Sequence, residues 1–244
     1  MEKQTLGKQY RFVEKLVARN KDANNAEMPV IAFLGDSVTQ GCFCANDTNA
    51  GYVSKFRYAL GKLFPAVPAY VLNAGIGGNN TEWAFRRIDR DVLPFHPDLV
   101  VVNLGLNDVW AEDRTAKDYR KFLGETFDKL LAAGTEVIFM TPNAMNYYRS
   151  GATEPHNMEL ALKTADYMTS GLFDEVVKVG REEAQKRNIA ISDTYRKWRN
   201  LYLQGVPTTE FLAGGINHPL PDAHWLFVTT LFDTLFRLNE DPDA

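Results

Sequence analysis

Five short runs of β-branched and large apolar residues recur along the chain, and segments of helical periodicity separate them. Each run is almost continuously apolar, which is typical of strands that are buried on both faces of a sheet. Buried strands that alternate with helices form a parallel sheet through right-handed crossovers. The runs cover residues 30–34, 70–73, 99–104, 136–140 and 189–192. The pattern predicts a doubly wound α/β sheet of five parallel strands.

Apolar side chains at three- and four-residue steps predict the helices of this fold. In residues 116–133 the periodic positions are aromatic residues and leucines, so we expect them in the core, and Gly134 ends the helix. The other predicted helices cover residues 9–19, 52–64, 81–93, 157–187 with a break near Gly171, and 223–238. The chain contains no repeat or linker, so we expect one domain over residues 1–244, with residues 1–28 as a helical extension packed on it.

Charge and hydropathy bear on partners and location. The 244 residues include 27 Lys and Arg and 31 Asp and Glu, a net charge of −4, with no basic stripe. We therefore expect no nucleic-acid or membrane partner. No apolar run approaches the roughly 20 residues of a transmembrane helix. The first twenty residues lack the apolar stretch of about 7–15 residues found in secretory signals, so we expect a cytoplasmic protein, although a removed leader would be invisible.

Cys42 and Cys44 are the only cysteines. They lie two residues apart, and a disulfide between them would close a small, strained loop. A reducing compartment fits this pattern. No second Cys or His pair stands at ligand spacing, so the sequence predicts no metal site.

Polar motifs stand where the predicted strands end. In open α/β sheets, ligands bind beyond the carboxyl ends of the strands. The first three runs lead into Gly-Asp-Ser at residues 35–37, a glycine-rich turn at residues 73–79 and Gly-Leu-Asn-Asp at residues 105–108. Asn-His-Pro at residues 217–219 precedes the last helix. A serine, a glycine turn, an asparagine and a histidine therefore arrive at one rim of the sheet.

These residue types suit acyl transfer. The Ser37 hydroxyl is a weak nucleophile unless an adjacent base, such as the His218 imidazole, takes its proton. A tetrahedral intermediate carries a negative oxygen, which needs fixed hydrogen-bond donors. The backbone of a glycine such as Gly78 can approach closely, and Asn107 supplies a neutral donor.

The four motifs together resemble the SGNH hydrolase superfamily, the GDSL-type esterases, over essentially the whole chain. The resemblance implies a three-layer α/β/α sandwich of flavodoxin-like topology, with the first strand between the second and third. It also implies site roles. Ser37 would be the nucleophile, His218 the general base, and Ser37, Gly78 and Asn107 the oxyanion hole. No cofactor is implied.

Each motif also has a structural interpretation. A lone Gly-Asp-Ser turn more often caps a helix, and only the other three motifs favour a nucleophile at Ser37. We expect Asp36 to hold the turn by binding backbone amides and Asp108 to brace a loop. The glycine turn resembles a dinucleotide fingerprint but has Asn80 in place of the third glycine, which argues against nucleotide binding.

The histidine region departs from the family pattern. His218 precedes Pro219 as in the family, and we favour it over His224, which we expect in a helix behind the site. The family places Asp three residues before the catalytic histidine, whereas this chain has Gly215. A backbone carbonyl, Glu210 or Asp222 remain as groups that could orient the imidazole.

The substrate is less constrained. Trp110, Asn143 and Tyr147 provide aromatic and amide groups that suit a sugar ring, and ordinary packing explains them equally well. The leading hypothesis is a serine esterase that removes small acyl groups, with acetyl groups on carbohydrate as the preferred candidate. The alternatives are a thioesterase or lysophospholipase with the same chemistry, and a non-catalytic carbohydrate-binding protein. The oligomeric state is open.

Overall fold

The computed structural model describes residues 10–44, 50–109 and 116–237. Its strands form one sheet in the order β2-β1-β3-β4-β5, and all pairs are parallel. The strands are β1 (Val30–Gly35), β2 (Tyr70–Gly75), β3 (Leu99–Asn103), β4 (Glu136–Met140) and β5 (Ala190–Ser192). The five predicted strands and the parallel sheet are confirmed, as is the place of the first strand between the second and third.

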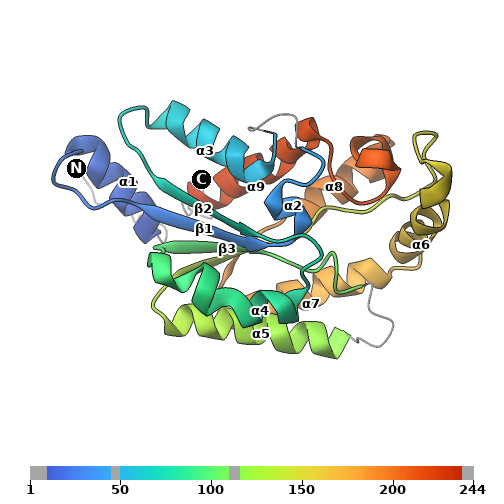
Figure 1. Ribbon diagram of the computed structural model, residues 1–244, viewed down its shortest axis with the longest axis horizontal. Coiled ribbons are helices and arrows are strands. Elements are labelled where there is room, and N and C mark those ends of the chain that lie inside the picture. The colour runs from blue at the N-terminus through green and yellow to red at the C-terminus, as the bar shows by residue number, and fades with distance from the viewer. Residues whose placement is uncertain (1–9, 45–49, 110–115, 238–244) are drawn as a thin grey trace, which may run out of the picture.

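Helices cover both faces of the sheet (Figure 1). On one face lie α3 (Tyr52–Leu63), α8 (Thr194–Leu203) and α9 (Trp225–Leu235). On the other lie α4 (Thr81–Asp91), α5 (Ala116–Ala132) and α7 (Leu172–Lys186). The helix predicted over residues 157–187 is divided into α6 (Met158–Thr169) and α7 at Gly171, whose φ is +83°. This arrangement confirms the three-layer sandwich.

Burial follows position in the sheet. The central strand β3 is buried at every residue, whereas the edge strand β2 is partly exposed. The helix α1 (Arg11–Lys21) packs at the amino end of the sheet, where its Lys15 forms an ion pair of 2.8 Å with Asp98. Among the described residues, no helix is long and apolar enough to cross a membrane.

Strand register brings three of the motifs to one edge. Gly35 at the end of β1 pairs with Gly75 of β2 and with Asn103 of β3. The residues that follow these three positions therefore leave the sheet side by side. A four-residue helix, α2 (Ser37–Gln40), begins directly after β1 at this carboxyl edge (Figure 1).

Two glycines let α2 lie close to the sheet. A Cβ atom at Gly35 would lie 1.9 Å from Thr39 Oγ1, and one at Gly75 would lie 2.3 Å from the backbone nitrogen of Gln40. Neither contact is sterically possible, so no side chain fits at these positions without moving α2. The close approach fixes Ser37 at the rim.

Candidate active site

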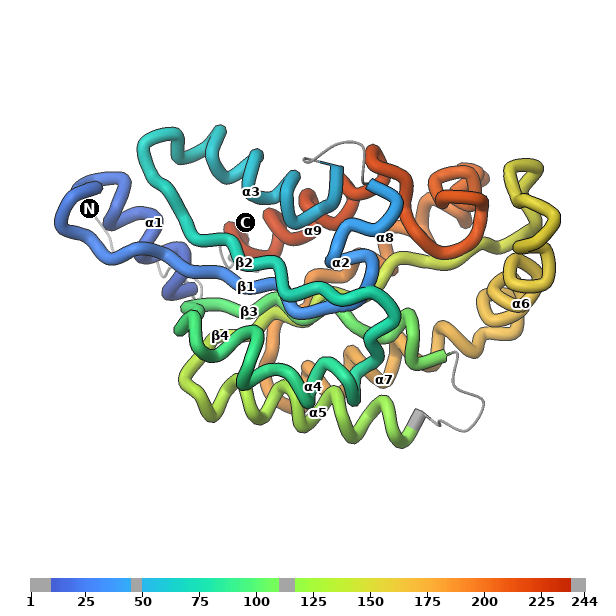
Figure 2. Tube along the Cα trace, in the orientation of Figure 1, coloured from blue at the N-terminus to red at the C-terminus, as the bar shows by residue number. Residues whose placement is uncertain are grey.

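Ser37 and His218 are in contact. The His218 Nε2 atom lies 2.8 Å from Ser37 Oγ, although 181 residues separate them in sequence. Figure 2 shows how the segment before α9 returns to the turn that follows β1. Burial lowers the pKa of the His218 imidazole below its usual range, which favours the neutral form that can accept the Ser37 proton. The geometry is that of a nucleophile and its base.

Asp36 fixes the start of α2. Its Oδ1 accepts a hydrogen bond of 2.9 Å from the Val38 N–H, as expected of a residue that caps a helix. Burial raises the pKa of this carboxyl to about 7, and the Val38 hydrogen bond opposes the rise. Gly41 ends the helix in the left-handed region, and its N–H and that of Cys42 donate to the Ser37 carbonyl. Ser37 is thus held from both sides of its turn.

Donors for a negative oxygen lie on the neighbouring loops. Gly78 has a φ of +73°, and open space surrounds the position where its Cβ would be. Within the described residues its N–H has no hydrogen-bond acceptor. Asn107 donates one Nδ2 hydrogen to the Asn79 carbonyl at 2.9 Å, and its second Nδ2 hydrogen has no acceptor in the part of the chain that the structure describes. These groups, with the amide of Ser37, can form an oxyanion hole.

Arg87 on α4 connects these loops, a role that the sequence pattern did not predict. Its guanidinium donates to the carbonyls of Gly35 and Ala74 at 2.8 and 2.7 Å, and to Asn79 Oδ1 at 2.7 Å. It therefore ties β1, which leads into Ser37, to Asn79, whose carbonyl accepts from Asn107. A signal exists in the sequence, because Arg87 falls in the buried stripe of its helix beside Ile88.

Aspartates and amides brace the same loops. Asp108 accepts from both the N–H and the hydroxyl of Thr81, the latter at 2.6 Å, and so holds the start of α4. This agrees with the bracing role expected from sequence. The Gln40 side chain accepts from the Gly77 N–H at 2.7 Å and links α2 to the glycine turn. No pattern in the sequence distinguishes Gln40.

No described carboxylate forms a hydrogen bond with the His218 ring, and the expectation for Glu210 and Asp222 does not agree with the structure. Glu210 accepts instead from Ser150 Oγ at 2.7 Å. Asp222 is exposed in the short helix Pro221–His224.

The position three residues before His218, where the family has an aspartate, has no room for a side chain in this fold. Gly215 has a φ of +61°, and a Cβ there would lie 2.4 Å from Ser150 Cβ. An aspartate at this position would therefore clash and be strained. The nearby Gly214 carbonyl accepts from Thr153 Oγ1 at 2.9 Å, and among the described residues no hydrogen bond joins it to the His218 ring.

Backbone contacts hold the His218 segment in place of an acid. Leu212 and Pro219 form an antiparallel bridge, and the Ala213 N–H donates to the His218 carbonyl at 2.7 Å. The loop after β4 supports the segment from behind, because Asn143 Nδ2 donates to the Asn217 carbonyl at 2.8 Å. Asn143 is 0% exposed, so the expected substrate contact of its side chain is corrected to a supporting role.

The structure bears on only one of the two aromatic residues that we expected near the substrate. Tyr147 stacks on Tyr202, with ring centroids 3.6 Å apart, which supports the packing interpretation of this residue. Trp110 lies outside the described residues.

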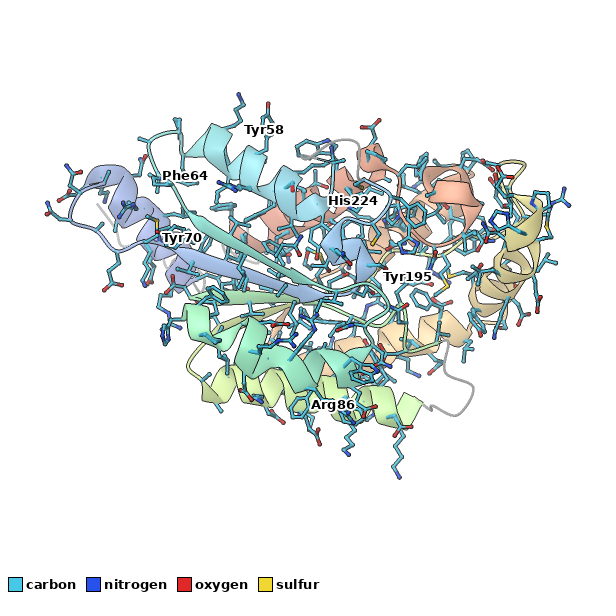
Figure 3. The ribbon with its side chains drawn as sticks, viewed as in Figure 1. Tyr58, Phe64, Tyr70, Arg86, Tyr195 and His224 are labelled. Atoms are coloured by element: carbon cyan, nitrogen blue, oxygen red, sulfur yellow. The ribbon has the colours of Figure 1, made fainter. Side chains whose placement is uncertain are left out.

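His224 lies behind the site, as expected, and packs between the starts of α3 and α9 (Figure 3). Its Nδ1 accepts from the Tyr52 N–H at 3.1 Å, so in the neutral ring Nε2 carries the proton, 3.3 Å from Cys44 Sγ. Burial, assisted by the nearby Lys55 ammonium, lowers the pKa of His224 to about 4.

This pKa predicts a loss of stability in acid. An unfolded histidine titrates near 6.5, so between about pH 6.5 and 4 the unfolded chain binds a proton that folded His224 does not. The stabilising contribution of neutral, buried His224 to the free energy of unfolding is fully present above that window. It decreases as the pH falls through the window, by about 3 kcal/mol in total. His224→Asn keeps an acceptor for Tyr52 and should lack this loss when urea unfolding is compared at pH 7 and pH 4.5.

The matched control is His96→Asn, since His96 is exposed. It should keep the wild-type pH dependence. Asp36 has the opposite effect on stability, because its raised pKa means that the folded state binds its proton more readily than the unfolded state does. This effect is the same in wild type and in both variants, so it cancels in the comparison. An identical acid loss in wild type and His224→Asn would contradict the prediction.

Comparisons with known proteins agree with this architecture. The model of the GDSL-like Lipase/Acylhydrolase family matches residues 33–226. An acetylxylan esterase of Geobacillus stearothermophilus is 34% identical over 91 residues, which are 34% of this chain and 41% of that protein. The matched part is therefore less than half of that relative.

Solved structures share the fold. LAE5, an alpha/beta hydrolase from the metagenome of Lake Arreo in Spain, is 20% identical over 87% of this chain and 97% of its own, with a TM-score of 0.66. The acetyl xylan esterase AlAXEase is 21% identical, covering 85% of this chain and all of its own (100%), with a TM-score of 0.65. Axe2, an acetylxylan esterase from Geobacillus stearothermophilus, is 22% identical over 86% of this chain and 94% of its own, with a TM-score of 0.65. At these identities the likeness shows the fold alone.

The family match spans well over half of the chain, and it includes the strand ends at which Ser37, Gly78 and Asn107 stand as well as the segment of His218. This chain belongs to the GDSL-like lipase/acylhydrolase family and is a carboxylic ester hydrolase.

Proposed function

We propose that the protein is a serine esterase that removes acetyl groups from carbohydrate through an acyl-Ser37 intermediate. The observation that carries the proposal is the contact of 2.8 Å between Ser37 Oγ and His218 Nε2, at the carboxyl edge of the sheet from which the loops of Gly78 and Asn107 also leave. Without a carboxylate on the imidazole among the described residues, Ser37 and His218 act as a dyad.

In the first half-reaction, Ser37 Oγ attacks the carbonyl carbon of the ester and its proton passes to His218 Nε2. The carbonyl oxygen becomes an oxyanion, which accepts hydrogen bonds from the amides of Ser37 and Gly78 and from Asn107 Nδ2. The intermediate collapses and the bond to the alcohol oxygen breaks. His218 returns the proton to this oxygen, which leaves acetyl on Ser37 and releases the alcohol.

In the second half-reaction, water takes the place of the alcohol. His218 accepts a proton from the water as its oxygen attacks the acetyl carbon, and the same donors hold the second oxyanion. Collapse breaks the bond to Ser37 Oγ, to which His218 gives the proton back, and releases acetic acid, which loses its remaining proton to water and leaves as acetate. The cycle needs no group beyond the described side chains, amides and water.

The names of the similar proteins support the substrate class. The relative with 34% identity is an acetylxylan esterase, and two of the solved structures of the same fold carry that description. The acyl group of such a substrate is acetyl and its alcohol is a sugar hydroxyl. We extend both to this chain as part of the proposal.

A fluorophosphonate probe tests the nucleophile directly. Intact mass and peptide mapping should place one adduct on Ser37 and none on other serines, and prior incubation with acetyl ester should slow the labelling. Ser192 provides an internal comparison, since it is buried and its hydroxyl has no hydrogen-bond partner among the described residues. A folded protein that takes up no probe would contradict the covalent mechanism.

A series of nitrophenyl esters tests the acyl group. We expect kcat/KM to be highest for acetate and to fall with butyrate and octanoate. A preference for octanoate would favour a lysophospholipase or thioesterase over the proposed function. Binding of acetylated xylo-oligosaccharide without release of acetate would instead favour a non-catalytic binding protein.

A further inference from the structure

Phe43 is an aromatic residue beside the dyad that the mechanism above does not use. Its ring lies on His218, with centroids 4.8 Å apart and planes tilted by 45°. The side chain is nevertheless 64% exposed, so most of the ring faces solvent and not the core. A large apolar group that is exposed next to reactive atoms is a candidate for contact with substrate.

The backbone of Phe43 indicates that the position is retained at a cost. Its φ is +64°, a left-handed conformation that is unfavourable for a bulky aromatic residue. Strain of this kind persists where the surroundings enforce it, and it concentrates at active sites. Glycine would adopt the same backbone readily, so packing and turn geometry alone do not call for phenylalanine here.

The neighbours of Phe43 make its position rigid. On one side, the Cys42 N–H donates to the Ser37 carbonyl at 3.0 Å. On the other, the Cys44 N–H donates to the Gly41 carbonyl at 3.1 Å, and Cys44 Sγ is buried against His224. The backbone at Phe43 is therefore held on both sides, and the contact of the ring with His218 places it beside the dyad. Such preorganisation lowers the entropic cost of binding.

The chemistry of the dyad indicates which part of the substrate would lie against the Phe43 ring. His218 Nε2 must give its proton to the alcohol oxygen, which requires that oxygen within about 2.6–3.2 Å of the nitrogen. The carbonyl oxygen lies elsewhere, at the donors of Gly78 and Asn107. A ring that covers His218 thus borders the alcohol and not the acyl group.

We propose that Phe43 is the platform for the alcohol part of the substrate, on which the apolar C–H face of a sugar ring packs while His218 protonates its oxygen. This inference rests on the proposed function and extends it, because it makes the preference for carbohydrate esters a property of one side chain. Sugars present such faces on pyranose rings, and aromatic side chains give them a large contact area at low entropic cost.

The test varies the alcohol at constant acyl group. For Phe43→Ala we expect KM for acetylated xylobiose to rise about five- to tenfold with kcat nearly unchanged. For ethyl acetate, whose alcohol is too small to cover the ring, kcat/KM should stay within about twofold of wild type. Phe43→Tyr should restore the wild-type KM for acetylated xylobiose.

Two further variants separate function from folding. Phe43→Gly relieves the left-handed strain, so its thermal midpoint should equal or exceed that of wild type while its KM for acetylated xylobiose rises as in Phe43→Ala. Tyr58→Ala removes a half-exposed aromatic ring of α3, labelled in Figure 3, and should change neither quantity.

Several results would overturn the inference. An equal loss of kcat for acetylated xylobiose and ethyl acetate would mean that Phe43 only positions His218. A changed preference among ethyl acetate, propionate and butyrate would place the ring at the acyl group, and an unchanged KM for acetylated xylobiose would leave it without a substrate role. In each case wild type still hydrolyses esters. A wild type that hydrolyses no ester would instead overturn the proposed function, and this inference with it.

Discussion

Replacement of Ser37 or His218 by alanine is expected to lower kcat for acetyl ester hydrolysis by about 10²- to 10⁴-fold, the range typical of a lost general base or its partner. Ser37→Ala removes the oxygen that carries the acetyl group. His218→Ala leaves the hydroxyl with no group to take its proton, because the described part of the chain offers Ser37 Oγ no other base. Both changes remove part of one proton-transfer unit.

The double variant gives the sharper measurement. Residues that act as a unit lose activity together, so Ser37→Ala/His218→Ala should be no slower than the slower single variant. The rates are read from acetate release under single-turnover conditions, and unchanged urea unfolding shows that the variants fold. Losses that multiply in the double variant would show two independent contributions and contradict the dyad.

Hydrophobic pattern alone is enough to locate the strands and most of the helices. The strand runs are distinct because β1, β3 and β4 are buried on both faces and need continuous apolar side chains. The prediction omits α2, which has only four residues, and α8. A helix of four residues is too short to show a helical period. The α8 segment does carry an amphipathic pattern, with Thr194, Tyr195 and Trp198 on its buried side, so the prediction misses this helix although its signal is present in the sequence.

Some residues of the site can also be placed from sequence, and others cannot. Ser37, Gly78 and Asn107 follow strands, so the topology of a parallel sheet is sufficient to place them at a common edge. Phe43 and Arg87 act through contacts that only the folded chain defines. The sequence shows an arginine in an apolar stripe, but not that it binds the carbonyls at the ends of β1 and β2.

The group that orients the His218 ring shows most clearly what the sequence does not predict. Gly215 shows in the sequence that the usual acid is absent, and Glu210 is near enough along the chain to replace it. The three-dimensional path of residues 208–219 decides the matter, since it carries the Glu210 carboxylate to Ser150. Sequence separation does not specify the direction of a side chain in an irregular loop, so proximity in the chain gave the wrong partner.

Asn107→Ala is expected to lower kcat by about 10²- to 10³-fold, the effect of removing one oxyanion donor. The donor stabilises charge that exists only in the transition state, so KM should change little. Asn107→Asp should be slower still, because it replaces the donor by a carboxylate whose charge repels the oxyanion. Steady-state hydrolysis of nitrophenyl acetate measures both.

The control separates this donor from the loop that carries it. Asn107 also binds the Asn79 carbonyl, so a loss of activity could in principle come from a displaced turn. Asn80→Ala perturbs the same turn, because Asn80 Oδ1 caps α4 through the Trp83 N–H at 3.1 Å, and this loss should cost about 1 kcal/mol of stability. If Asn107 acts as a donor, Asn80→Ala melts earlier but keeps its kcat, whereas Asn107→Ala loses kcat out of proportion to any change in melting. Parallel losses of kcat and stability in both variants would assign Asn107 to the support of the turn.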